Sequence, residues 1–179
     1  MLCTFGFGRI GVLLSDLYFV NPSPAAGQEG AEHGVRLEIR VLERGELKGS
    51  IYSAQPISVG RPIWRADLLE SVGGKPGSFD RAHYHPAFTG WEPGRRVFAR
   101  ELSADPVAWL AGQLSDLPEV LKEAGVAADV AAPGDAESLR RAVPDILEAT
   151  ERLLGQVRRG ELGTLPAGGP ADSVRAGWL

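Results

Sequence analysis

The hydrophobic and polar residues of segment 35–42 alternate strictly, which predicts a β-strand. Val35 and Leu37 share one face of such a strand, whereas Arg36 and Glu38 lie on the other. A period of two is typical of a strand that buries one face and exposes the other.

Similar β-type segments recur through the first hundred residues. Short runs of Gly, Pro and polar residues, such as Gly60-Arg61-Pro62, separate them and favour turns between neighbouring strands. The predicted strands are 5–20, 35–42, 50–59, 63–69, 81–87 and 95–102. Because the connections are short, we expect the strands to pair mostly antiparallel.

The period of the hydrophobic pattern changes after Ser103. Apolar residues then recur every three or four positions, which predicts helices near 106–114, 118–124 and 144–159. The last of these has cations and a glycine at its carboxyl end, a common helix stop. The predicted fold class is therefore α+β, with a mostly antiparallel sheet in the N-terminal two-thirds packed by C-terminal helices.

Length and composition predict a single domain. The chain has 179 residues, of which 44% are hydrophobic, enough for one core. We expect an α+β domain at 1–160 and a Gly-, Ala- and Pro-rich tail at 161–179. Cys3 is the only cysteine and the chain has no long apolar run, so we expect a cytoplasmic protein without an internal disulfide or a membrane span.

The charge is distributed unevenly along the chain. The net charge is -4, but residues 61–100 hold seven Lys and Arg against four Asp and Glu. The segments before and after this region both have a negative net charge. A local positive field attracts anions even on an acidic protein.

Two of the three histidines, His83 and His85, lie two positions apart within this basic region. On a strand they share a face, and Arg81 precedes them on that face. If the strands 63–69 and 81–87 pair across the loop centred on Lys75, Asp67 lies opposite His83 and Arg65 lies opposite His85. We expect these side chains to form one patch on the exposed face of the sheet.

This patch has the residue types of an acid–base or anion-binding site. His83 would act as a base oriented by Asp67, and His85 as an acid. Arg65 and Arg81 would bind a phosphate or carboxylate through their forked donors. The combination suits cleavage of a phosphodiester such as RNA, and this scheme requires no cofactor.

Two tryptophans fall on predicted core faces, at Trp64 and Trp109. Trp91 differs because it lies in the predicted turn TGWEPG, close to Arg95 and Arg96. We expect Trp91 to line the mouth of a pocket next to the histidines.

The segments IWRADLL and FDRAHYH together resemble the Arg-x-Asp and His-x-His arrangement of the TumE-like toxins of bacterial toxin–antitoxin pairs. The resemblance covers about residues 48–88, and Arg65, Asp67, His83 and His85 occupy the matching positions. It implies a small α+β toxin-like domain that a partner protein neutralises. The chain lacks the histidine-rich turn after the aspartate that accompanies this pattern in the family.

Two further functions also fit the sequence. His83 and His85 would form a two-histidine metal site, completed by Asp67, Asp80 or Glu92. Alternatively, the chain is a non-catalytic module whose sheet edge and amphipathic helix 144–159 bind a protein partner or a second copy of the chain. The sequence leaves open whether the protein is an enzyme.

Overall fold

The computed structural model describes residues 1–47, 49 and 55–165. Its main feature is an antiparallel sheet with the strand order β1-β2-β3-β4-β5. The strands are β1 (Leu2–Gly6), β2 (Ile10–Val20), β3 (Ala31–Arg44), β4 (Ile57–Ser71) and β5 (His83–His85). Each strand pairs with its neighbour in the sequence, as short connections require.

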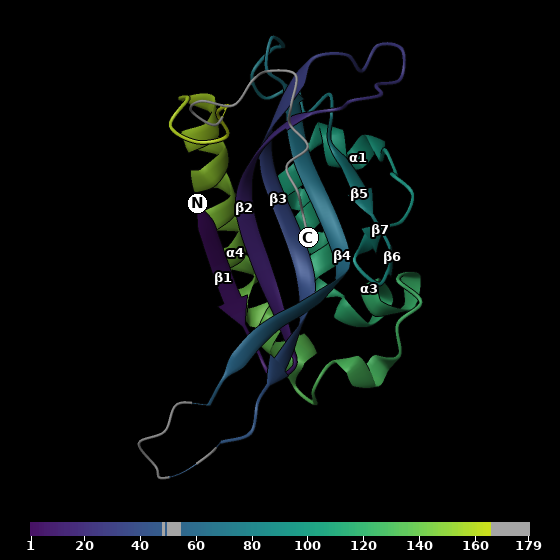
Figure 1. Cartoon of the computed structure of the whole chain (residues 1–179), viewed down its shortest axis with the longest axis vertical. Coiled ribbons are helices and arrows are strands. Elements are labelled where there is room, and N and C mark those ends of the chain that lie inside the picture. The colour runs from purple at the N-terminus through teal and green to yellow at the C-terminus, as the bar shows by residue number, and fades with distance from the viewer. Residues whose placement is uncertain (48, 50–54, 166–179) are drawn as a thin grey trace.

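The last third of the described chain is helical and packs on one face of the sheet. The remaining elements are β6 (Phe88–Thr89), β7 (Glu92–Pro93), α1 (Arg100–Ala104), α2 (Pro106–Ser115), α3 (Leu117–Glu123), the 3-10 turn η1 (Ala128–Val130) and α4 (Asp135–Arg158). The long helix α4 crosses behind β2 and β3 (Figure 1). The α+β fold class predicted from the sequence is thus confirmed.

The alternating pattern explains which face of the sheet meets the helices. Val35, Leu37 and Ile39 are fully buried in the core between the sheet and the helices. Trp64 is also fully buried there, and its ring stacks at 5.8 Å on that of Trp109. The charged residues that alternate with these positions lie on the opposite face.

No helix in the described part of the chain combines the length and the apolar character that a bilayer crossing demands.

The predicted first strand, 5–20, is in fact two strands joined by a tight connection. Asp135, at the start of α4, accepts hydrogen bonds from the backbone N–H groups of Gly8 (2.7 Å) and Arg9 (3.0 Å). This carboxylate satisfies donors that the turn would otherwise leave unpaired, and it ties the β1–β2 turn to the helical layer. The residues that make this contact are far apart in the sequence, so the local pattern does not predict it.

Two predicted strands, 50–59 and 63–69, belong to a single strand, β4, as far as they are described. Residues 50–54 lie outside the described part. The prediction of a turn at Gly60-Arg61-Pro62 is wrong because the chain accommodates it as an irregularity. The pairing shifts from Ile39 opposite Trp64 to Arg40 opposite Pro62. Pro62 lacks a backbone N–H, and a bulge tolerates that loss.

The helices at 106–114 and 118–124 are confirmed as α2 and α3, each capped by an aspartate side chain. The helix predicted from residue 144 begins earlier, at Asp135, and Pro144 lies inside it. Leu139 and Val143 are buried on the same face as Ile146. The stability gained from burying this face exceeds the stability lost with the one backbone hydrogen bond that Pro144 cannot make.

The predicted strand 95–102 is replaced by a single bridge from Val97 to Tyr84 and by α1. The predicted tail, 161–179, falls outside the described residues from position 166 onward. Within its described part, the backbone N–H of Gly163 donates to Asp16 at 2.9 Å.

Candidate functional site

The pairing of β4 with β5 brings the histidines and the aspartate together. Asp67 lies opposite His83 and Arg65 lies opposite His85, as the sequence-based register predicted. The hairpin between the two strands contains Gly77, whose φ of 82° suits glycine, and its N–H donates to Glu70 at 2.8 Å. The turn thus fixes the register on which the site depends.

The cluster of Asp67, His83 and His85 is buried, with exposed fractions of 2%, 3% and 5%. The expectation of a water-facing patch is therefore wrong. These side chains do lie on the sheet face opposite the helices, but the two imidazoles pack on each other and on Phe98 and Phe88, and residues of the segment 91–96 line the same cavity. This cavity has a volume of about 1070 Å³, and its wall includes the cluster.

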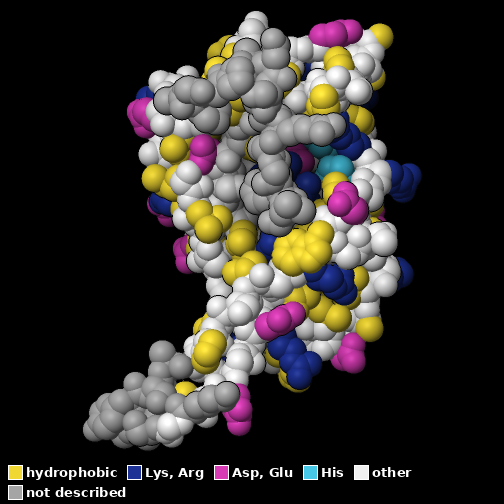
Figure 2. Space-filling view, viewed as in Figure 1, with side chains coloured by type: hydrophobic (Ala, Val, Ile, Leu, Met, Phe, Trp, Pro, Cys, Tyr) yellow, Lys and Arg dark blue, Asp and Glu magenta, His cyan; other side chains and the backbone are white. Residues whose placement is uncertain are grey.

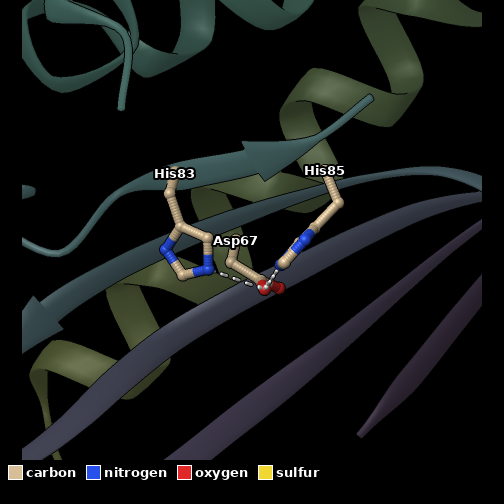
Figure 3. A group of neighbouring side chains, drawn as sticks. All are labelled: Asp67, His83 and His85. Carbon is tan, nitrogen blue, oxygen red and sulfur yellow. Dashed lines mark ion pairs between the residues drawn. The ribbon is translucent and has the colours of Figure 1, made fainter. Parts of the chain in front are cut away.

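The orientation of both imidazoles is set by backbone carbonyls. The Nδ1–H of His83 donates to the carbonyl of Arg81 (2.8 Å), and that of His85 donates to the carbonyl of Gly94 (2.9 Å). Because a carbonyl oxygen can only accept, each ring must carry its proton on Nδ1. The Nε2 atoms then point at Asp67 Oδ2, at 3.4 Å from His83 and 3.8 Å from His85 (Figure 3).

The electrostatic surroundings favour the charged form of the aspartate and the neutral form of both histidines. Burial would raise the pKa of Asp67, but Arg36, which bonds both carboxylate oxygens at 2.7 and 3.2 Å, holds that pKa below its ordinary value. Burial lowers the pKa of His83 and of His85, and the negative charge of Asp67 only partly opposes it. Two neutral imidazoles therefore present lone pairs toward a carboxylate.

A second group of ion pairs lies on the same face of the sheet. It is centred on Glu38, two residues along β3 from Arg36. Glu38 accepts hydrogen bonds from Arg40 at 2.7 Å and from Arg65 at 2.8 Å. Arg65 thus reaches the cavity, as the sequence predicted, but its guanidinium pairs with a carboxylate of the protein. Arg36, Glu38 and Arg40 were not recognised as site residues, although their alternation placed them on the polar face.

Arg81 is separate from the site. Its guanidinium donates to the carbonyl of Glu29 at 3.3 Å and lies 3.4 Å from the carboxylate of Asp80. It does not line the cavity, because its guanidinium is held between Glu29, in the β2–β3 connection, and Asp80. Asp80 is itself engaged with the backbone N–H of Ser71 at 3.0 Å. Neither residue joins the three-residue cluster.

The rest of the cavity wall is largely apolar. It includes Leu17, Phe19, Leu69 and Trp91. Trp91 is 61% exposed, and the guanidinium of Arg40 lies 5.4 Å from its ring centre, so the prediction that Trp91 lines the pocket is confirmed. Histidine side chains are visible on this face of the molecule, with Lys or Arg side chains beside them (Figure 2).

Comparison of the chain with protein-family models, with curated proteins and with solved structures finds no match. The resemblance to TumE-like toxins therefore stays a prediction from the sequence, and the chemistry of the site rests on its own geometry.

Proposed function

We propose that this protein binds a divalent transition metal ion through His83 Nε2, His85 Nε2 and Asp67 Oδ2. One observation carries the proposal: three acceptor atoms converge, and the one described donor to any of them is Arg36, which bonds Asp67 Oδ2 at 3.2 Å. Both Nδ1 protons are committed to backbone carbonyls, so the facing Nε2 atoms carry lone pairs. Acceptors that face one another in a buried site repel unless a cation lies between them.

The distances suit a metal ion. Metal–ligand bonds of about 2.1 Å would place neighbouring ligand atoms about 3 to 4 Å apart, for angles between about 90° and 130°. The two distances to Asp67 Oδ2, 3.4 and 3.8 Å, lie in this range. All three ligand atoms lie within 4.8 Å of one another, and among the described residues no other group of at least three potential ligand residues lies this close together.

The outer contacts also fit metal binding. Histidine ligands commonly donate their second ring N–H to a carbonyl or carboxylate, which fixes the tautomer, and both histidines do so here. Arg36 bonds both oxygens of Asp67, including the Oδ2 that faces the histidines, and would orient the carboxylate. Two imidazoles and one carboxylate suit zinc, iron(II) or related ions and leave coordination positions open to water or a ligand.

The metal-free acid–base scheme is less well supported by the same contacts. In that scheme His83 offers one nitrogen to Asp67 and the other to a substrate. Here Nδ1 of each histidine is already bonded to a carbonyl, at 2.8 and 2.9 Å. RNA cleavage, cytoplasmic location and a protein partner stay predictions from the sequence.

The proposal is tested by titrating chelator-treated protein with Zn²⁺ or Co²⁺ and measuring heat and visible absorption. We expect one ion per chain in the wild type and at least a tenfold loss of affinity in His83→Ala and in His85→Ala. His33→Ala is the matched control, because His33 lies in β3 and does not line the cavity. Equal binding in all variants, or none in the wild type, would refute the proposal.

A further inference from the structure

An apolar row of the sheet lies directly beside the proposed metal ligands. In the register of the sheet, Leu17, Gly34 and Leu69 pair across β2, β3 and β4, two residues along from the row that contains Asp67 and His83. Two residues of a strand span about 7 Å. Leu17 and Leu69 line the cavity, and Phe19 lines it beyond them.

Position 34, between Leu17 and Leu69 in this row, has room only for glycine. A Cβ at this position would lie 2.0 Å from the backbone oxygen of Leu68, so the position admits no side chain. Leu17 and Leu69, on either side of Gly34 in this row, both line the cavity, so this part of its wall is hydrocarbon.

The charges of the cavity favour an anion next to this row. Among the residues that the structure describes, four arginines and three carboxylates line it, a net charge of +1 before any metal is added. They are Arg36, Arg40, Arg65 and Arg96, with Glu38, Asp67 and Glu92. Arg36, Arg40 and Arg65 are held by Asp67 and Glu38. Arg96 makes no ion pair with any residue that the structure describes.

Arg96 also lies where an anion could bridge it to the metal ligands. Its guanidinium is 6.0 Å from the ring centre of Phe19, at the apolar end of the cavity. Arg96 lines the same cavity as Asp67, His83 and His85. Arg96 thus borders both the apolar row and the cluster.

We propose that the cavity binds an organic acid with a hydrocarbon body, whose carboxylate lies between the metal and Arg96 and whose body packs on Leu17, Leu69 and Phe19. This inference rests on the proposed metal site. The carboxylate takes an open coordination position and a charge-assisted hydrogen bond from Arg96. Burial of the hydrocarbon supplies the remaining affinity, at about 25 cal/mol per Å² of apolar surface.

The test uses the full chain loaded with Co²⁺, with loading measured first by elemental analysis. Octanoate is then titrated while the cobalt absorption is recorded, and acetate, octan-1-ol and inorganic phosphate serve as comparison probes. We expect octanoate to perturb the spectrum and to bind at least about tenfold more tightly than the others, because only octanoate has both the anion and the hydrocarbon. Protein that does not load with Co²⁺ would refute the metal site itself.

Protein that loads normally but binds acetate, octanol or phosphate as tightly as octanoate would refute this inference and leave the metal site standing. Variants sharpen the distinction. Arg96→Gln is expected to weaken octanoate binding about tenfold or more and to leave cobalt loading unchanged. Arg95→Gln is the matched control, because this exposed neighbour does not line the cavity. Equal losses in the two variants would also overturn the proposed contact.

Discussion

Replacing Arg36 by methionine removes the protein's own counter-charge from the buried carboxylate of Asp67. Arg36 bonds both oxygens of Asp67, and its side chain is 18% exposed. Methionine keeps much of the length and the apolar character of the arginine stem. The variant therefore isolates the charge while the packing on β3 is largely kept.

Breaking a buried ion pair costs about 3 to 5 kcal/mol. Because Arg36 is partly solvated, we expect a loss of about 2 to 4 kcal/mol in the free energy of unfolding of the metal-free protein. For a chain of this size that corresponds to a fall in melting temperature of roughly 5 to 15 °C.

Metal should restore most of this loss. A divalent ion bound by Asp67, His83 and His85 supplies the positive charge that Arg36 no longer provides. By linkage, the ion stabilises the variant more than the wild type. We expect the stability difference between the two proteins to fall to about 1 kcal/mol or less at saturating Zn²⁺.

The assay is urea unfolding of both proteins, once in chelator and once in excess Zn²⁺. Arg40→Met is the matched control, because Arg40 lies on the same face of β3 and its partner Glu38 keeps a second arginine, Arg65. This control should lose less stability and gain nothing extra from metal. An Arg36→Met protein that is equally destabilised with and without Zn²⁺ would refute the reasoning.

Two further predictions concern the framework of the site. Burial raises the pKa of Glu32, with Arg96 and Arg81 only partly opposing it, so the wild type loses stability as pH rises through that raised pKa. Glu32→Gln should therefore be more stable than the wild type at pH 7 and equally stable well below the ordinary pKa of glutamate. Thermal melts across pH test this, and a difference in melting temperature that stays constant with pH would contradict it. Asp135→Ala removes the acceptor for Gly8, Arg9 and Ala132 and should cost about 2 to 3 kcal/mol in urea unfolding, whereas Asp135→Asn should cost less.

The central part of the site could be predicted from the sequence because it depends on one local pairing. Residues two apart on a strand share a face, and consecutive strands joined by the connection 72–82 pair antiparallel about its centre. Those two facts place Asp67 opposite His83 and Arg65 opposite His85, as the structure has them.

The rest depends on contacts between distant segments. The segment 91–96, which carries the carbonyl of Gly94 that orients His85, lines the same cavity as the cluster. No local pattern shows that this segment lies beside the histidines. The pairing of Arg36 with Asp67 requires the order of β3 beside β4, and the alternation of charges in β3 indicated only that Arg36 lies on the polar face.

The predicted strand and helix boundaries were wrong where long-range contacts outweighed a proline that locally predicts the end of a strand or helix. Pro62 and Pro144 both read as breaks in the sequence. One sits at a bulge in β4, and the other lies within α4, where a continuous buried face sustains the helix.

The most direct measurement is a crystal of the chelator-treated protein soaked in Zn²⁺, with anomalous diffraction recorded at the zinc edge. Our account predicts one strong peak in the cavity, about 2.0 to 2.2 Å from His83 Nε2, His85 Nε2 and Asp67 Oδ2. An empty cluster, with zinc bound only at surface carboxylates or at His33, would contradict it.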